Sequence, residues 1–274
     1  MRLPLPEHTR GPTSGSLLAA GGGQLEETGI LQRFVALAGG LGSRITIIPT
    51  AGDAEPTGSY TSYNEAFMRI GVTDIEILHT WDRAVADSEP FASALRSSDG
   101  VWFGGGRQWR CTDAYLETQV HRELDALLDR GGVIGGTSAG ATLQGSFMIR
   151  GDTSGNEVVI GDHTEGFGFL EGVCIDQHHL VRNRHFDMLE VVQKHPELLG
   201  IGIDEDTAIV VRGNELKVIG RSYVAVYDPS KTLGEEGVFF FLRAGDRYDL
   251  EKREIVVASP THRGFDRITT RPPE

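Results

Sequence analysis

A serine lies at the centre of a glycine-rich run whose spacing could support nucleophilic catalysis. The run reads Gly136-Thr137-Ser138-Ala139-Gly140 and matches the pattern Gly-x-Ser-x-Gly. A strand-like stretch precedes it and a helical stretch follows, which is the context of a tight turn that exposes the serine hydroxyl beside backbone N–H groups. The pattern predicts that Ser138 is a nucleophile. A glycine turn that binds phosphate or only packs closely is the alternative.

A serine hydroxyl needs a histidine to take its proton and a carboxylate to orient that histidine. Among the nine histidines, His178 is the candidate base because an apolar, strand-like run from Val173 ends there in a cluster of polar residues. Three others are expected to be solvated or structural: His163, His179 and His185. The acid is expected among three neighbouring carboxylates: Asp204, Glu205 and Asp206.

Alternating strands and helices would have to position these groups. Strand-like runs, several of them rich in β-branched residues or ending in glycine, occur at 16–20, 44–49, 74–78, 100–103 and 133–136. Helices are expected at about 25–37, 62–70 and 112–129. This alternation predicts an α/β fold with a mostly parallel sheet and helices on both faces. After about Thr207, short strand-like runs follow without long helices, so we expect an antiparallel, β-rich end.

One domain is expected to contain all of these elements. The chain has 274 residues, of which 39% are hydrophobic and 24% charged, as in an ordinary globular protein. It contains no repeat, low-complexity tract or linker that would divide it. We therefore expect a single domain over residues 1–274, with an N-terminal tail at 1–15 and a β-rich C-terminal extension at about 212–274.

Charge and composition argue against several classes of function. The formal net charge of −13 would repel the phosphate backbone of a nucleic acid. No run approaches the roughly 20 apolar residues that a membrane-spanning helix needs. Proline and glutamate stand where a secretory signal would have its apolar run, so we expect a cytoplasmic protein. Cys111 and Cys174 lie far apart, without Cys-x-x-Cys spacing, and are expected to be buried thiols.

Four sequence blocks together resemble the cyanophycinase family of serine peptidases: Gly105–Gln108, Gly136–Ala141, Asp176–His178 with Arg182 and Arg184, and Gly202–Glu205. The resemblance extends over about residues 17–211. It implies a fold similar to class I glutamine amidotransferases and dipeptidase E, with a catalytic triad of Ser138, His178 and Glu205. It also implies a peptide substrate and a homodimer. No metal or cofactor is needed for such a mechanism.

The resemblance further implies which residues surround the nucleophile. The substrate would be bound by Gln108, Asp176, Gln177, Arg182 and Arg184. Arginines can pair with substrate carboxylates through the bidentate guanidinium, although two surface arginines that balance an acidic protein would look the same in sequence. The oxyanion would be held by the backbone N–H of Ala139 and by one from the Gly105-Gly106 turn.

Two positions depart from the family's pattern. Asp187 stands where a third arginine is usual, and His179 stands where an aromatic residue usually follows Asp-Gln-His. A carboxylate in place of a guanidinium inverts a local charge. We therefore expect hydrolysis of an aspartyl or isoaspartyl peptide, of which cyanophycin, an aspartate backbone with arginine on each side chain, is one example.

Other functions compete with this interpretation. An aspartyl dipeptidase of different specificity would share the triad. An esterase of the α/β-hydrolase type shares the Gly-x-Ser-x-Gly pattern, but its acid precedes its histidine. A metal-dependent enzyme or a non-catalytic binding protein could use a cluster of ligands: Asp176, His178, His179 and His185. A dinucleotide site at Gly21–Gly23 is disfavoured because Glu26 stands where a third glycine belongs.

Overall fold

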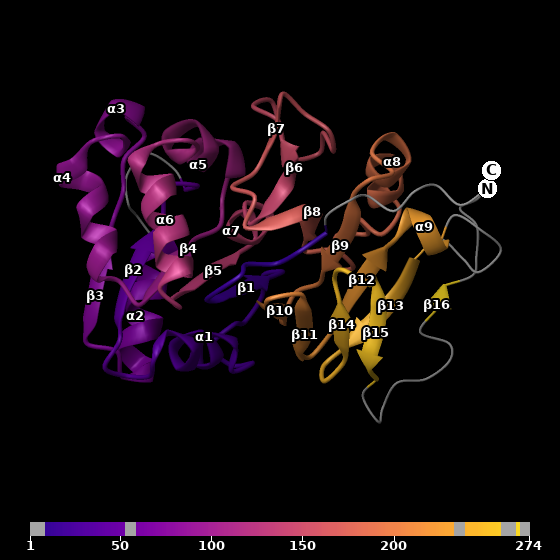
Figure 1. The fold of residues 1–274 in the computed structure, drawn as a ribbon, viewed down its shortest axis with the longest axis horizontal. Helices are drawn as coiled ribbons and strands as arrows, with labels where there is room; N and C mark the ends of the chain where they lie inside the picture. Colours follow the sequence, from indigo (N-terminus) through magenta and orange to yellow (C-terminus); the bar gives the residue numbers. More distant parts are fainter. Residues whose placement is uncertain (1–8, 53–58, 233–238, 259–266, 269–274) are drawn as a thin grey trace.

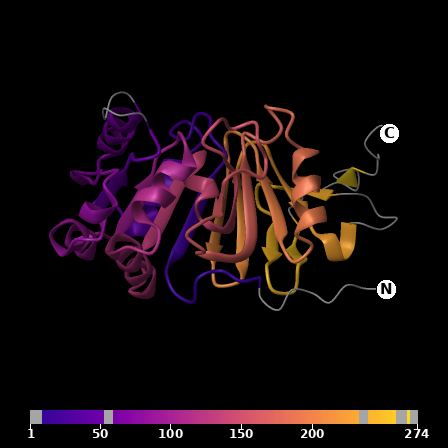
Figure 2. The same ribbon diagram turned by 90° about the horizontal axis from the view of Figure 1, so that it is seen from above.

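Two β-sheets and the helices around them make up the protein. The computed structural model describes residues 9–52, 59–232, 239–258 and 267–268. Within these ranges one sheet has nine strands and the other has seven. Figure 1 shows the N-terminal half, indigo to magenta, at one end of the molecule and the C-terminal strands, orange to yellow, at the other. The view from above in Figure 2 shows the same division.

The nine-stranded sheet has a parallel and an antiparallel part. In spatial order the parallel strands are β1 (Ser16–Ala20), β5 (Val133–Thr137), β4 (Gly100–Phe103), β2 (Arg44–Ile48) and β3 (Asp74–Ile77). Antiparallel pairing continues from the other side of β1 through β10 (Thr207–Arg212), β11 (Glu215–Gly220), β14 (Arg247–Asp249) and β15 (Glu254–Val257). The predicted strands and the antiparallel C-terminal end are confirmed.

Helices cover both faces of the parallel strands. Successive residues of a strand face opposite sides of a sheet, so Leu18 joins an apolar cluster with α1 (Ile30–Ala38) and α2 (Ser59–Ile70), whereas Leu17 joins a cluster with α6 (Gln119–Asp129). The predicted α/β class is confirmed. The other helices of this half are α3 (Arg83–Ala86), α4 (Glu89–Ala92), the short 3₁₀ helix η1 (Ser93–Ser97), α5 (Gln108–Tyr115) and the short α7 (Ala139–Thr142), which follows β5.

The seven-stranded sheet was not anticipated as a separate sheet. Its order is β16 (Arg267–Ile268), β13 (Phe239–Arg243), β12 (Tyr223–Tyr227), β9 (Leu199–Ile203), β8 (Leu170–Gln177), β6 (Gly145–Gly151) and β7 (His163–Glu165). Strands β6, β8 and β9 are parallel. The cluster that contains Leu17 also contains Val173 and Ile201 of this sheet, so apolar burial joins the two sheets. Helices α8 (Asp187–Lys194) and α9 (Pro229–Thr232) belong to this half.

Two predicted helices have different boundaries in the structure. The helix expected at 25–37 begins only at Ile30, because Gly29 before it has a φ of +76°. The helix expected at 112–129 is two helices, α5 and α6, separated at Glu117, whose φ is +60°. The hydroxyl of Thr118 donates to the carbonyl of Tyr115 at 2.7 Å, and this local bond competes with continuation of the helix.

The sequence also led to a prediction for the two cysteines. Cys111 and Cys174 are free and buried as predicted, and burial raises the pKa of each thiol far above its ordinary value. Among the described residues, no helix combines the length and the apolar character needed to cross a bilayer.

The sequence motifs that could carry chemistry lie just beyond the carboxyl ends of parallel strands in both sheets. Strands β1, β4 and β5 end just before Gly21, Gly104 and Ser138. Strands β8 and β9 of the second sheet end just before His178 and Asp204. Carboxyl ends of parallel strands are where α/β proteins place their sites, so this edge is where the candidate residues can meet.

Candidate active site

Ser138 lies at the sharp turn between β5 and α7 (Ala139–Thr142). Its backbone has φ 53° and ψ −115°, a strained conformation for a residue with a side chain. The turn is tight, because a Cβ atom on Gly136 would lie 2.3 Å from the carbonyl oxygen of Gly140. The structure therefore contains the strand-to-helix turn that the Gly-x-Ser-x-Gly pattern predicts.

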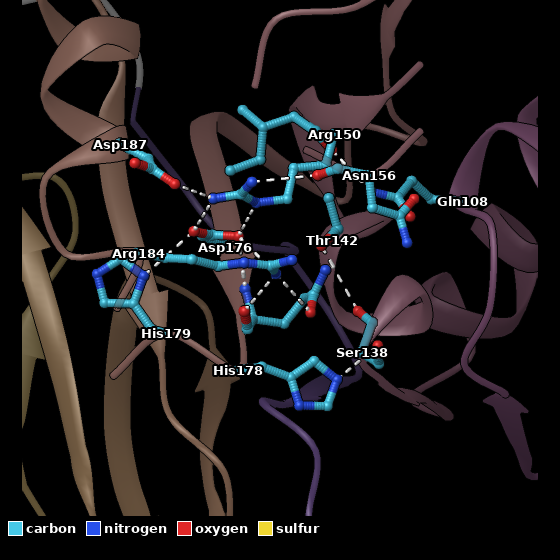
Figure 3. Close-up of polar contacts among 12 residues, drawn as sticks. Gln108, Ser138, Thr142, Arg150, Asn156, Asp176, His178, His179, Arg184 and Asp187 are labelled. Carbon is cyan, nitrogen blue, oxygen red and sulfur yellow. Dashed lines mark hydrogen bonds and ion pairs between the residues drawn. The ribbon is translucent and has the colours of Figure 1, made fainter. Parts of the chain in front are cut away.

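His178 and Glu205 lie beside this serine, each just beyond the end of a strand of the second sheet. The Nε2 atom of His178 is 3.0 Å from Oγ of Ser138, and Nδ1 is 2.6 Å from Oε1 of Glu205. Figure 3 shows the imidazole of His178 facing Ser138. His178 has a φ of 50°, and its N–H donates to the carbonyl of Gly21 at 2.9 Å. Hydroxyl, imidazole and carboxylate thus form one hydrogen-bonded chain.

The bonds around His178 fit a neutral imidazole. A carboxylate only accepts, so Nδ1–H donates to Glu205, and Nε2 is left to accept the proton of the Ser138 hydroxyl. Burial lowers the pKa of His178 from its ordinary 6.5; the hydrogen bond to Glu205 opposes this shift, and the positive charge of Arg182 adds to it. At neutral pH the ring can therefore accept a proton from the serine.

The glycines at 21–23 make room for this ring. A Cβ atom on Gly22 would lie 2.3 Å from Cε1 of His178 and 2.6 Å from its Nδ1. Gly22 also has a φ of +119°, which residues with side chains rarely adopt. The run that resembled part of a dinucleotide motif therefore lies against the histidine, and any side chain at Gly22 would displace it.

The three carboxylates after β9 have separate partners. Only Glu205 bonds to His178. Asp204 accepts two backbone N–H groups, each at 3.0 Å, from the loop that follows the histidine. Asp206 accepts the backbone N–H of Gln24 at 2.6 Å and so ties the glycine run to the same strand end. Tertiary structure thus separates three acids that look alike in sequence.

The two backbone segments predicted to hold an oxyanion lie next to Ser138. Ala139 is the first residue of α7, where an N–H has no partner within its own helix. A Cβ atom on Gly105 would lie 3.3 Å from Cβ of Ser138, so the Gly105-Gly106 turn lies directly against the serine. Gly106 has a φ of +137° and no room for a side chain, because a Cβ there would lie 2.1 Å from the carbonyl oxygen of Ala51.

The predicted substrate-binding residues differ in their exposure to solvent. Arg182 is exposed, whereas Gln108, Gln177 and Arg184 are at most 3% exposed and Asp176 is completely buried. Arg184 donates to the main-chain oxygen of Gln177 at 2.9 Å and to its Oε1 at 3.2 Å. Gln108 donates to a main-chain carbonyl of β6 at 2.8 Å, and its buried Oε1 accepts no hydrogen bond from the described residues.

Arg150, which the sequence analysis missed, is bonded to Asp176, one of these predicted residues. It is 1% exposed and donates to both oxygens of Asp176 at 2.9 and 3.2 Å, to Asp187 at 2.6 Å and to the carbonyl of Asn156 at 3.1 Å. Figure 3 shows its guanidinium between the two aspartates. Burial tends to raise the pKa of Asp176, but hydrogen bonds from His179 and Arg150 hold it well below its usual range. The one feature of the sequence that could have drawn attention to Arg150 is that it is a lone charged residue in the apolar run of β6.

The other histidines behave as the sequence suggested. His179 is fully buried between Asp176 and Tyr227, a structural position. His163 is half-buried between two exposed aspartates, and His185 is also half-buried. The cluster considered as a metal site is therefore divided among different partners. Within the described ranges, no three histidine, cysteine or acidic side chains are placed to hold a metal ion.

Comparison with known sequences agrees with the resemblance seen in the motifs. The model of the family described as peptidase family S51 matches residues 17–219. A cyanophycinase of Synechococcus elongatus is 35% identical over 228 residues, which cover 81% of this chain and 70% of the relative. A cyanophycinase of Trichormus variabilis is 36% identical over 268 residues, which cover 90% and 89%. The similarity to cyanophycinases predicted from four short blocks is confirmed over most of the chain.

Comparison with solved structures supports the same fold. The crystal structure of a peptidase from an acI-B1 actinobacterium matches 87% of this chain and 98% of its own, with a TM-score of 0.64 at 23% identity. At that identity the match shows the fold alone, and the family rests on the sequence comparisons. Since these extend over most of the chain, the protein belongs to peptidase family S51 and is a serine hydrolase that acts as a peptidase.

Proposed function

We propose that Ser138, His178 and Glu205 are the catalytic triad. Oγ of Ser138 attacks the peptide carbonyl while Nε2 of His178 takes the hydroxyl proton, and Glu205 stabilises the imidazolium that forms. His178 then returns the proton to the leaving amine, which leaves an acyl group on the serine. Water, deprotonated by the same histidine, attacks this ester and releases the acid. The single observation that supports the proposal is the bonded chain of 3.0 and 2.6 Å centred on His178.

The backbone around the serine supports the same mechanism. The N–H groups of Ala139 and Gly106 would stabilise the oxyanion of the tetrahedral intermediate, and losing one such donor typically costs about 3 kcal/mol of barrier lowering. The candidate acid follows the candidate base in the chain, whereas α/β-hydrolases have the acid first. This order disfavours the esterase alternative.

The substrate we propose is an aspartyl or isoaspartyl peptide. Support comes from the relatives named cyanophycinase and from Arg182 and Arg184, two cations close enough to His178 to lower its pKa. Arginine suits the recognition of a carboxylate because its guanidinium offers two parallel donors. Asp187, which stands where a third arginine is usual in the family, accepts a hydrogen bond from Arg150 at 2.6 Å and adds no positive charge beside Arg182 and Arg184. We therefore propose the wider class of acidic peptides and treat cyanophycin as one member.

A serine replacement tests the triad. Ser138→Ala should abolish hydrolysis of a panel of aspartyl, isoaspartyl and arginine-bearing peptides read by mass spectrometry. Ser97→Ala, at an exposed serine on η1, is the matched control and should leave turnover unchanged. A fluorophosphonate probe should label the wild-type protein at the peptide that contains Ser138. Full turnover by folded Ser138→Ala, or labelling at another serine, would refute the assignment.

A further inference from the structure

The connection between β6 and β7 brings Asn156 to the candidate active site. Its Oδ1 accepts a hydrogen bond from Nη1 of Arg107 at 2.7 Å, and its main-chain carbonyl accepts one from Nη1 of Arg150 at 3.1 Å. Figure 3 shows the second of these bonds. Asn156 therefore links two guanidinium groups, and each of them leads to a different part of the proposed catalytic machinery.

Arg107 leads to the turn proposed to hold the oxyanion. It directly follows the Gly105-Gly106 turn, and a Cβ atom on the first glycine would lie 3.3 Å from Cβ of Ser138. The backbone N–H of Arg107 donates to the carbonyl of Ala51 at 2.7 Å, and its side chain is held by Asn156. Both contacts limit how far the turn can move.

Arg150 leads to the candidate base and to the predicted substrate-binding residues. It has a φ of 55°, and the pairing of β6 with β7 shifts register in this part of the strand. Such an irregularity can re-aim a side chain next to a site. The Arg150 guanidinium donates to both oxygens of Asp176 at 2.9 and 3.2 Å, and Asp176 lies two residues before His178. One buried guanidinium therefore joins Asn156 to the strand end that carries the base.

The next residue in the chain places the same connection beside the predicted substrate-binding residues. Burial lowers the pKa of Arg184, and the negative charge of Glu157 is among those that oppose this shift. Glu157 itself is exposed. The segment at 156–157 thus borders both the oxyanion turn and the residues expected to bind substrate.

We propose that Asn156 is a positioning residue that holds the oxyanion turn in place relative to the catalytic base. This inference rests on the proposed triad and on the proposed oxyanion donors. The contacts that support it form a closed path around Ser138: the Gly105-Gly106 turn, Arg107, Asn156, Arg150, Asp176, and His178, whose Nε2 lies 3.0 Å from the serine Oγ. Truncating Asn156 breaks this path at its bond to Arg107 and leaves every contact of His178 in place.

A second tie between α5 and β6 limits the size of the effect. Gln108, the residue after Arg107, donates to the main-chain carbonyl of Ile149 at 2.8 Å. Loss of the Asn156 side chain should therefore loosen the turn without releasing it. Removing an oxyanion donor outright costs on the order of 100- to 1,000-fold in kcat, so we expect a smaller fall, of about tenfold.

Steady-state kinetics of Asn156→Ala on an aspartyl or isoaspartyl peptide tests the proposal. Alanine removes the acceptor for Arg107 and keeps the carbonyl that Arg150 binds, so kcat should fall about tenfold while KM changes less than about twofold. The loss should appear in kcat because an oxyanion donor acts only in the transition state. Asn156→Asp keeps an acceptor for Arg107 and should restore kcat to within about twofold of wild type.

Arg107→Met removes the same bond from its other side. It should lower kcat by a similar factor, and the double variant Arg107→Met/Asn156→Ala should be no slower than either single variant. Effects that multiply, or a kcat of folded Asn156→Ala within about twofold of wild type, would overturn the proposal. A rise in KM with unchanged kcat would also overturn it, because that pattern reports a contact made already in the ground state.

Asn214→Ala is the matched control and should leave kcat unchanged. This asparagine also accepts a hydrogen bond through Oδ1, from the N–H of Gly11 at 3.3 Å, but it lies in the turn after β10. Val211 of β10 pairs with Leu17 near the start of β1. The turn at Asn214 is therefore at the opposite end of β1 from the active site.

Turnover by Ser138→Ala distinguishes a failure of this inference from a failure of the proposed function. If that variant keeps full turnover, the triad is wrong and the inference falls with it. If it is inactive and Asn156→Ala is not impaired, the triad stands and only the role of Asn156 is wrong.

Discussion

Adding one methyl group at Gly22 should disable the base without replacing any residue of the proposed triad. In Gly22→Ala the new Cβ would lie 2.3 Å from Cε1 of His178, whereas carbon atoms in ordinary contact are about 3.5 Å apart. The ring or the glycine run must therefore move by about 1 Å. His178 is bonded at 3.0 Å on one side and 2.6 Å on the other, so such a shift disturbs both bonds.

The size of the effect follows from that displacement. A misplacement of about 1 Å can cost on the order of 100-fold in rate, and a positioned general base contributes on the order of 100- to 10,000-fold. We therefore expect kcat of Gly22→Ala to fall about 100-fold, equivalent to about 2.7 kcal/mol of activation free energy. KM should change little, because the ring acts on the serine hydroxyl.

The matched control is Gly39→Ala. Gly39 has a φ of +115°, close to the +119° of Gly22, but a Cβ there would meet no atom within 4 Å. In both variants, placing alanine in a left-handed conformation should cost about 1–2 kcal/mol of stability. Gly22→Ala should lose further stability from the contact with the ring. Only Gly22→Ala should lose activity. If folded Gly22→Ala keeps kcat within about twofold of Gly39→Ala, the role assigned to Gly22 in positioning the imidazole of His178 is wrong.

Two further predictions concern charge. Because His178 must be neutral to accept a proton and burial lowers its pKa, kcat/KM should rise with pH along an acid limb whose midpoint lies below 6.5. Arg182→Gln removes a charge that lowers this pKa and should move the limb to higher pH; an unmoved limb in the pH–rate profile would contradict the stated cause. In Arg253→Met, the fully buried Asp228 loses a guanidinium at 3.2 Å, so the free energy of unfolding should fall by about 3–5 kcal/mol in urea titrations. The control Arg10→Met breaks an exposed pair with Glu171 and should cost under about 1 kcal/mol; equal losses would refute the role of burial.

Local signals predicted the strands well and the helix ends less well. Runs such as Arg44–Ile48 are β-branched and end at turns, so neighbouring residues alone favour a strand. The break between α5 and α6 depends on the hydroxyl of Thr118 and the left-handed backbone of Glu117, which compete with a helical pattern that continues through them. The division into two sheets could not be foreseen, because β9 to β12 follow one another in the chain but β10 and β11 join one sheet and β9 and β12 the other.

Part of the candidate site could also be predicted from local sequence. The Gly-x-Ser-x-Gly run by itself pointed to Ser138 as the candidate nucleophile, because a turn that exposes a hydroxyl needs small residues at fixed short spacing. The sequence also restricted the acid to three adjacent carboxylates, and the resemblance to cyanophycinases pointed to Glu205 among them. These are statements about residues within a few positions of one another, where chain geometry limits the outcomes.

Tertiary structure alone decided which residues far apart in the chain contact one another. It placed Arg150 of β6 between Asp176 and Asp187, and it enclosed His179 between Asp176 and Tyr227. It also pressed Gly22 against the imidazole of a residue more than a hundred positions away. Such pairings depend on how strands from different parts of the chain are ordered in a sheet, and no local preference specifies that order.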